Sequence, residues 1–358
     1  MNSESVSAES EPVQPVTVLI TGTSGFIGLN LLEALSPLPH RVVGLADRPI
    51  PDKARAALAE PRLVPVLETI DIRDPDAVAE ATERYRPDVV IHAAAVTAGP
   101  ERERNEARAV IDVNIGGTQS VLDACSAAGV RRLVHVSSGA VYGRAAFGPD
   151  RLDETTPVVP TTYYGITKLA AEQLSHRHAE LHDLDVVVAR LSAVFGPWEY
   201  PTGVRDFMSP MLQMVEAARD GTPIRLVADR PRNWVYALDA ARALVALALK
   251  PELGHDCYNL CPETTTTTVR FLERLAAAYA DAGAGIDDAI VDDPEQATIV
   301  FDADPRLRRA PVSSWRITQE LGAVEREERH TTSFWTSPDD AFDGYIAWAR
   351  TRSGTAAD

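Results

Sequence analysis

The chain has 358 residues, of which 45% are hydrophobic and 24% are charged, as in an ordinary globular protein with a packed core. Its formal net charge of −17 argues against the clustered Lys and Arg residues that nucleic acids require, so we expect no nucleic-acid partner. The three cysteines, Cys125, Cys257 and Cys261, have neither metal-type nor redox-type spacing and are expected to be free thiols. We expect a cytoplasmic protein without a membrane partner, because no basic-then-apolar leader opens the chain and no run of about 18 apolar residues occurs.

The first half of the chain alternates apolar, β-branched runs with segments of helical spacing. The runs predict strands at Val16–Thr21, Arg41–Ala46, Val64–Ile70, Asp88–His92, Arg132–Ser137 and Asp185–Leu191. The periodic segments predict helices at Phe26–Leu35, Asn114–Ala128 and Tyr164–Leu181. Continuous apolar strands separated by helices indicate a parallel sheet covered on both faces. With right-handed crossovers, the sequence therefore predicts an α/β, doubly wound (Rossmann) fold.

The second half is less regular. Gly196–Gly203 is rich in turn residues, Phe207–Arg219 has helical spacing, and Asn233–Leu249 combines a short strand with a second helix. Long polar stretches separate the remaining helices, so we expect a smaller and partly discontinuous unit here.

A glycine-rich motif follows the first strand directly. Gly22, Gly25 and Gly28 occupy the first, fourth and seventh positions of a turn that leads into a helix. Glycines at this spacing permit a tight turn, a close approach of a pyrophosphate to the backbone, and close packing of helix on strand. The positive end of the helix then points at the phosphates. The motif predicts a dinucleotide site made by Gly22, Ser24, Gly25, Phe26, Ile27 and Gly28.

Asp47 and Arg48 end the second strand and bear on the choice of dinucleotide. A carboxylate at this point accepts hydrogen bonds from the adenine-ribose hydroxyls and repels a 2′-phosphate, which favours NAD over NADP. Arg48 is a competing signal, because an arginine one place later suits a phosphate. Asp71 and Ile72, after the third strand, are expected beside the adenine ring, although a solvated loop carboxylate would explain Asp71 nearly as well.

Tyr164 and Lys168 are the expected centre of the chemistry. Spaced four apart, they lie on one face of a helix, so the lysine ammonium can stabilise the phenolate and let the phenol exchange a proton near neutral pH. Ser138 follows the fifth strand, at the sheet edge where ligands bind in doubly wound folds. It is expected to donate a hydrogen bond to the substrate oxygen. Ser137 is the competing assignment.

Taken in order, these motifs resemble those of the extended short-chain dehydrogenase/reductases, also called the NAD-dependent epimerase/dehydratase family. The resemblance covers about residues 16–260. It extends to Asn114 in Val-Asn-Ile-Gly-Gly-Thr, to Arg190–Pro197 and Arg232–Asp239, and to His92-Ala93-Ala94-Ala95. The resemblance implies that Ala93, Ala94, Ala95 and Asn114 belong to the cofactor site. It also implies NAD as cofactor, Tyr164 as acid/base, Ser138 as the group that polarises the substrate oxygen, and Lys168 as the residue that holds the nicotinamide ribose.

Two departures from the family pattern narrow the expected activity. Gly139 and Ala140 stand where the sugar 4,6-dehydratases resemble one another in having Asp-Glu, so dehydratase activity is not expected. Ala193 stands where nucleotide-sugar epimerases and decarboxylases generally have Asn, so one hydrogen bond to a substrate phosphate is lost. Arg232 is retained and suits either a diphosphate or a carboxylate, unless it forms a structural ion pair. Arg205, in the loop after Trp198, is a further expected substrate contact.

The leading hypothesis is an NAD-dependent oxidoreductase that interconverts a secondary alcohol and a ketone on a sugar, a sugar acid or a similar polyhydroxy substrate. The first alternative is a nucleotide-sugar epimerase with tightly bound NAD, and the remote one is a non-catalytic dinucleotide-binding regulator. We expect a homodimer, as in the family. The expected division is a disordered acidic tail over residues 1–15, an NAD-binding Rossmann domain over 16–191 with a return segment at about 230–260, a substrate domain made of 192–229 and 261–352, and a disordered tail over 353–358.

Overall fold

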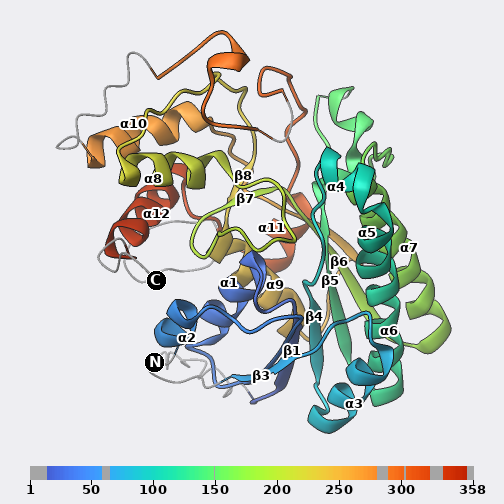
Figure 1. Cartoon of the computed structure of the whole chain (residues 1–358). Coiled ribbons are helices and arrows are strands. Elements are labelled where there is room, and N and C mark those ends of the chain that lie inside the picture. The colour runs from blue at the N-terminus through green and yellow to red at the C-terminus, as the bar shows by residue number, and fades with distance from the viewer. Residues whose placement is uncertain are drawn as a thin grey trace, which may run out of the picture.

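A seven-stranded parallel sheet runs through the middle of the molecule (Figure 1). The computed structural model describes residues 14–58, 65–148, 150–279, 289–301, 304–322 and 334–352, so most of the expected N-terminal tail, the whole C-terminal tail and Val64 lie outside the described residues. All neighbouring strands in the sheet are parallel. Their spatial order is β3 (Val66–Thr69), β2 (Arg41–Ala46), β1 (Thr17–Thr21), β4 (Val89–His92), β5 (Arg132–Ser138), β6 (Asp185–Leu191) and β9 (Cys257–Leu260).

Helices cover both faces of this sheet. Successive residues of each strand point to opposite faces, so each strand contributes side chains to two cores. Val18 and Ile20 pack in one apolar core, while Leu19 packs in another. The first core contains α1 (Phe26–Leu35) and α9 (Ala237–Leu249), with α2 (Asp52–Leu58) beside α1. The second is covered by α3 (Pro75–Tyr85), α6 (Thr118–Ala128) and α7 (Tyr163–His182). The expected doubly wound Rossmann fold is confirmed.

A third apolar core belongs mainly to the C-terminal half, at the upper left of Figure 1. It is rich in aromatic rings, and Phe195 and Phe271 each contact both Phe342 and Tyr345. The elements that carry this core are β7 (Ala193–Phe195), β8 (Trp234–Tyr236), α8 (Pro210–Asp220), α10 (Thr268–Ala278) and α12 (Pro338–Arg352). α11 (Trp315–Leu321) packs instead against β9. The expected domain boundaries stay a prediction.

Several elements begin or end differently from the expected ranges, for local reasons. The helix expected from Phe207 begins at Pro210, because the Ser209 hydroxyl accepts a hydrogen bond from the amide of Leu212 (3.1 Å) and Pro210 occupies the first turn. The helix expected from Asn114 begins within a π-helical turn, Asp112–Gly117, and is α-helical only from Thr118. Such turns are frequent at functional sites. The third strand shortens to Val66–Thr69.

Besides α2 and α3, two short helices after β4 were not expected from the sequence: α4 (Pro100–Asn105) and α5 (Ala107–Ile111). Among the described residues, no helix is both long and apolar enough to cross a membrane.

Candidate active site

The glycine-rich turn between β1 and α1 forms a tight cradle. Gly22 has φ +76°, a left-handed conformation, and a Cβ there would lie 2.7 Å from the Cα of Ala94. A Cβ on Gly28 would lie only 2.1 Å from the carbonyl oxygen of Gly22. The turn is held by the Gly22 amide, which donates to the Leu45 carbonyl (2.7 Å), and by the Gly25 amide, which donates to Gly22 (2.9 Å). Space kept free of side chains at a helix N-terminus is what a dinucleotide pyrophosphate needs, so the residues present fit this cofactor.

The turn lies where the strand order reverses, between β1 and β4. In open α/β sheets, ligands bind at this switch point, outside the carboxyl ends of the strands. Ala93, Ala94 and Ala95 leave β4 there, and the Ala94 amide donates to the Thr21 hydroxyl (3.2 Å). The structure thus brings Ala93 and Ala94 against the glycine turn, and the part of all three alanines in cofactor binding stays a prediction.

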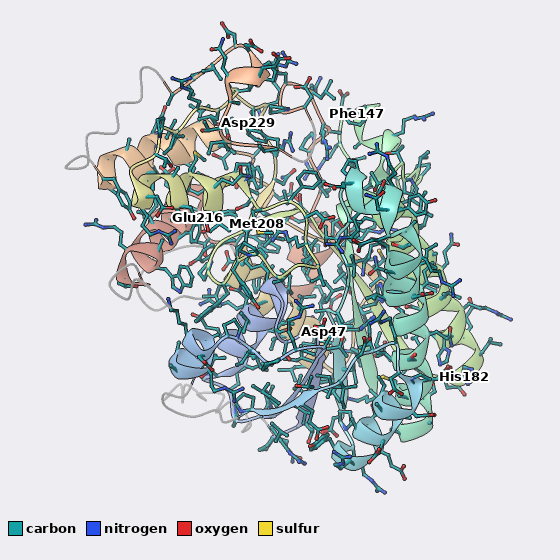
Figure 2. All side chains as sticks on the ribbon, in the orientation of Figure 1. Asp47, Phe147, His182, Met208, Glu216 and Asp229 are labelled. Atoms are coloured by element: carbon teal, nitrogen blue, oxygen red, sulfur yellow. The ribbon has the colours of Figure 1, made fainter. Side chains whose placement is uncertain are left out.

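Asp47 lies at the end of β2, near the middle of the molecule (Figure 2). Arg48 donates to both of its carboxylate oxygens, from Nε (3.1 Å) and from Nη2 (2.6 Å). The third nitrogen, Nη1, donates to the carbonyl of Thr202. Arg48 is therefore occupied by a carboxylate and a carbonyl, an arrangement that favours NAD over a 2′-phosphorylated dinucleotide.

Asp71 and Ile72 diverge in their surroundings. The Asp71 carboxylate accepts hydrogen bonds from the Arg73 side chain, at 3.1 and 3.0 Å from Nε, and this pairing holds the pKa of Asp71 below its ordinary value. Ile72 is buried, and a Cβ on Gly117 would lie 2.4 Å from its Cδ1. Ile72 therefore packs against the π-helical turn, while the Asp71 carboxylate is engaged by its own loop.

Asn114 joins three segments around the site. Its amide oxygen accepts from the Val96 amide (2.8 Å), and its nitrogen donates to the Val96 carbonyl (3.0 Å). The same nitrogen donates to the Thr167 hydroxyl on α7 (3.0 Å). Asn114 is 1% exposed and fully occupied by these bonds, so it fixes the loop after β4 relative to α7 and acts on the site through their position.

Ser137 and Ser138 differ clearly in the structure. Ser137 is buried, and its hydroxyl donates to Oε1 of Glu172 (2.5 Å). Ser138 ends β5 half-buried, at the carboxyl edge of the sheet, and its hydroxyl accepts from the Ala140 amide (3.1 Å). Ser138 keeps a hydroxyl proton for a substrate, whereas the Ser137 proton is already committed to Glu172. The geometry favours Ser138.

The first turn of α7 packs directly on the loop after Ser138. Thr162 caps the helix by accepting from the Gly165 amide (3.0 Å). A Cβ on Gly165 would lie 2.7 Å from the carbonyl oxygen of Ala140, so the contact requires glycine. Tyr164 is half-buried on this turn, and Lys168, one turn on, is 2% exposed. The fold thus packs the segments that carry Ser138, Tyr164 and Lys168 against one another.

Lys168 carries a buried positive charge. Burial lowers its pKa to about 8, and the carboxylate of Glu172 opposes this shift. Burial and the Lys168 charge lower the pKa of His92 to about 3 and that of His135 well below its ordinary value. Both imidazoles are therefore neutral at pH 7 while the ammonium is charged. His92 is fixed between the Thr21 hydroxyl (2.7 Å) and the Thr118 hydroxyl (3.0 Å).

A buried polar network beneath Lys168 escaped the sequence analysis. Glu172 is 2% exposed and is gripped by Arg190, whose Nε lies 3.0 Å from Oε1 and whose Nη2 lies 2.8 Å from Oε2. Nη1 of Arg190 donates to the Tyr142 hydroxyl (3.3 Å), which donates to Asn259 on β9 (2.8 Å). The available signal was spacing, because Glu172 follows Lys168 by the same four residues that separate Tyr164 from Lys168.

The residues expected to bind substrate do not all lie in one place. Ala193 begins β7, which pairs with β8, and Arg232 lies two residues before β8. The Arg232 guanidinium lies over the ring of Phe301, 5.9 Å from its centroid. Arg205 lies elsewhere, with its guanidinium 5.0 Å from the ring centroid of Phe26 and 2.9 Å from the buried carboxylate of Glu199. Arg205 therefore sits beside the start of α1.

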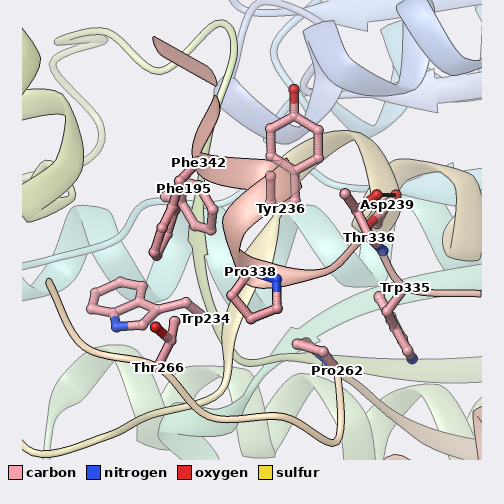
Figure 3. Close-up of a pocket in the computed structure, with 11 residues that line it drawn as sticks. Phe195, Trp234, Tyr236, Asp239, Pro262, Thr266, Trp335, Thr336, Pro338 and Phe342 are labelled. Carbon is pink, nitrogen blue, oxygen red and sulfur yellow. Dashed lines mark hydrogen bonds between the residues drawn. The ribbon is translucent and has the colours of Figure 1, made fainter. Parts of the chain in front are cut away.

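A small cavity in the C-terminal half lies beside the β7–β8 pair, and its lining includes Trp234 and Thr266. It encloses about 10 Å3, at the lower limit for one water molecule. Aromatic rings form much of its wall, and Thr336 lies beside Asp239 (Figure 3), with its amide donating to Oδ2 at 2.7 Å. The cavity is a packing gap in the aromatic core and too small for a substrate.

The family model for the NAD-dependent epimerase/dehydratase family matches residues 18–261. The chain belongs to this family. It is therefore an enzyme of the extended short-chain dehydrogenase/reductase type, and its cofactor is NAD, as the sequence predicted. The part of Asp47 in selecting NAD, and the individual roles of the other site residues, stay predictions.

Curated relatives act on nucleotide sugars. The UDP-glucuronate 4-epimerase of Thermodesulfobacterium geofontis is 31% identical over 271 residues, which cover 72% of this chain and 80% of the relative. The dTDP-glucose 4,6-dehydratase of Streptomyces griseus is 30% identical over 316 residues, covering 85% and 88%. The family prediction is thus confirmed by relatives that carry out two different reactions.

Solved structures agree on the architecture. UDP-glucose 4-epimerase from Thermotoga maritima, determined with UDP-glucose, matches with a TM-score of 0.75 at 20% identity, over 94% of this chain and 99% of that one. At that identity the match shows the fold alone. UDP-glucose 4-epimerase from Thermus thermophilus, in complex with NAD, matches with a TM-score of 0.70 at 25% identity, over 93% and 99%.

Proposed function

We propose that this family member interconverts a secondary alcohol and a ketone on a sugar or a similar polyhydroxy substrate, using Ser138, Tyr164 and Lys168. The observation that carries the proposal is the contact between the Ser138–Ala140 loop and the first turn of α7. It sets the half-buried Ser138 and Tyr164 at the carboxyl edge of the sheet, one helical turn from the buried Lys168. This is the residue set needed to move a hydroxyl proton while a hydride leaves the same carbon.

Each residue has a defined part in the proton transfer. Ser138 donates a hydrogen bond to the substrate oxygen, and the phenolate oxygen of Tyr164 takes the hydroxyl proton as the carbonyl forms. Lys168 remains charged at pH 7, with its pKa at about 8, and stabilises the phenolate. NAD, when bound at the glycine turn, supplies the acceptor for the hydride that leaves the carbinol carbon. In the reverse direction Tyr164 returns the proton to the oxygen.

Replacement of Tyr164 by Phe tests this assignment. The substitution keeps the ring and removes the exchangeable proton, so turnover should fall by about 10² or more. NAD affinity, measured by calorimetric titration, should change little. Ser138→Ala should lower turnover less, and Ser137→Ala less again, because the Ser137 proton already goes to Glu172. A Tyr164→Phe enzyme with full activity would contradict the proposed mechanism.

A nucleotide-sugar epimerase is the second candidate, favoured by relatives of that activity and by Arg232, a cation suited to a diphosphate. The two candidates differ in net redox change. A dehydrogenase changes the NADH absorbance during turnover with a sugar alcohol, whereas an epimerase interconverts two epimers with no net change. Calorimetry with UDP, dTDP and GDP separates the substrates, and tight binding of any one of them favours the epimerase. Dehydratase chemistry is not proposed, because neither Gly139 nor Ala140 can exchange a proton.

A homodimer remains part of the proposal. Tyr163, Ile166, Leu174 and Leu181 are exposed on one face of α7, and Ile111 is exposed on α5 beside it. Apolar residues in such a row suit a second copy of the same helix pair. Light scattering after gel filtration would measure the mass of the particle. The cytoplasmic location expected from the sequence stays a prediction.

A further inference from the structure

The segment from Trp198 to Asp206, called here the strap, crosses the glycine turn. One end of the strap is held on α1. The Asn30 side chain donates to the carbonyl of Pro197 (2.8 Å), and the Trp198 indole donates to Glu33. The Tyr200 hydroxyl then donates to the backbone carbonyl of Ser24, inside the glycine motif itself.

The middle of the strap reaches the end of β2. Arg48 donates to the carbonyl of Thr202 while it holds Asp47, so a single guanidinium links the strap to the residue expected to bind the adenine ribose. Arg205 follows, over the ring of Phe26, the first residue of α1. Three points of the expected dinucleotide site are thus in contact with the strap: the glycine turn, the start of α1 and the end of β2.

The far end of the strap is fixed on the loop after β4. The Thr97 amide donates to the Val204 carbonyl (2.8 Å), and the Asp206 amide donates to the Thr97 carbonyl (3.1 Å). The Asp206 carboxylate accepts from the Gly99 amide (2.7 Å) and pairs with Arg102 (2.9 Å). The strap therefore spans from α1 to α4, over the switch point of the sheet.

The backbone of the strap is strained where it begins. Trp198 has φ +66°, a left-handed conformation that is rare for an aromatic residue. Such a conformation persists only when surrounding contacts over-determine it, and it is typical of functional loops. Glu199, next in the chain, is buried and accepts from the Ser209 amide (2.7 Å), so the strap is also tied to the start of α8.

We propose that the strap is the outer wall of the dinucleotide site and keeps the bound NAD from exchanging between turnovers. Release of NAD then requires the strap to detach from the glycine turn or from the loop after β4, which makes dissociation slow. On the proposed function, from which this step takes its substrate chemistry, the hydride of a retained NADH returns either to the ketone just formed, as in an epimerase, or to a second substrate in the same site. The strap thus favours the epimerase over a dehydrogenase that uses NAD as an exchanging cosubstrate.

The test is the rate at which isotopically labelled NAD leaves the loaded protein when unlabelled NAD is in excess. Two variants loosen opposite ends of the strap without touching the expected catalytic residues. Asp206→Ala removes the contacts to Gly99 and Arg102, and Tyr200→Phe removes the bond to Ser24. Each should raise the dissociation rate by about tenfold or more, since most affinity changes within one site appear in the off-rate. Asp304→Ala is the matched control and should leave the rate unchanged, because this exposed carboxylate pairs, among the described residues, with Arg306 in its own turn.

Circular dichroism checks that both variants are folded. If one variant is not folded, the dissociation rate of the other tests the proposal. Dissociation rates within twofold of wild type in the folded variants would overturn the proposal. A wild-type protein that releases NAD faster than it turns over substrate would overturn it as well. Because label exchange needs no substrate, its outcome is independent of the Tyr164→Phe experiment, and the strap and the proposed chemistry can fail separately.

Discussion

At the carboxyl edge of the sheet, residues near one another in sequence hold the expected catalytic groups in place. Thr162 caps the helix that carries Tyr164 and Lys168, and the glycine turn is closed by a bond between Gly22 and Gly25. The strap is held in the opposite way. Tyr200 meets Ser24 across 176 positions, and Arg48 meets Thr202 across 154. Local caps and turns shape the segments that carry the chemistry, whereas the enclosure around them depends on long-range contacts.

The strongest test of that contrast is Gly28→Ala. A Cβ would lie 2.1 Å from the Gly22 carbonyl oxygen and 2.6 Å from the Cα of Thr23, so the turn must open. We expect NAD affinity to fall by about 100-fold, or roughly 2.7 kcal/mol, with a lower melting temperature. Calorimetric titration with NAD measures the first and circular dichroism the second.

Gly148→Ala is the control for this change. Gly148 is exposed, has φ −98°, and its nearest neighbour to an added Cβ lies 4.0 Å away, so both quantities should stay at the wild-type value. If Gly28→Ala bound NAD as tightly as the wild type, the glycine turn would not be the cofactor cradle.

The same contrast explains what the sequence could predict. Gly22, Gly28, Ser138, Tyr164 and Lys168 sit in short motifs whose spacing alone places them at helix starts and strand ends, and the structure brings them to one edge. The position of Arg205 was beyond that reasoning, because no local pattern says that its guanidinium lies on Phe26. The place of β9 beside β6 was also beyond that reasoning, because this pairing depends on tertiary packing. Asp71 shows a second limit of sequence patterns, since spacing does not reveal that Arg73 binds its carboxylate.

Glu172 tests the contrast between local and long-range contacts, because it follows Lys168 by one helical turn and also binds Arg190 in the buried network. Its carboxylate raises the pKa of Lys168 against the effect of burial. The ammonium is charged below a pH of about 8 and is lost above it, so turnover should decline as pH rises through about 8. In Glu172→Gln the lysine loses that support, and the alkaline limb should move to lower pH by about one unit. The pH dependence of kcat measures this shift.

Folding must be followed in the same variant, since Arg190 loses its charged partner and the buried pair stabilises the fold only while intact. Glu180→Gln is the matched control on α7, because its carboxylate is exposed and pairs with Arg177 at the surface. This control should leave the alkaline limb in place. An alkaline limb that stayed in place in the folded Glu172→Gln enzyme would show that Glu172 holds structure without supporting the Lys168 charge.

The smallest expected effect concerns Asp47 and Arg48, where the locally built site and the strap meet. Wild type should bind NAD at least about tenfold more tightly than NADP, or about 1.4 kcal/mol, because the Asp47 carboxylate repels a 2′-phosphate. Asp47→Asn removes that repulsion and frees Arg48 from its carboxylate partner, so the two affinities should converge. Arg48→Gln should keep the preference for NAD, since Asp47 remains, while NAD dissociates faster because the bond to Thr202 is lost. Titration with both dinucleotides measures the ratio, and label exchange measures the rate. Equal affinities in the wild type would mean that Arg48 governs the choice of dinucleotide. An Arg48→Gln protein with an unchanged dissociation rate would mean that the middle of the strap does not help to retain the cofactor.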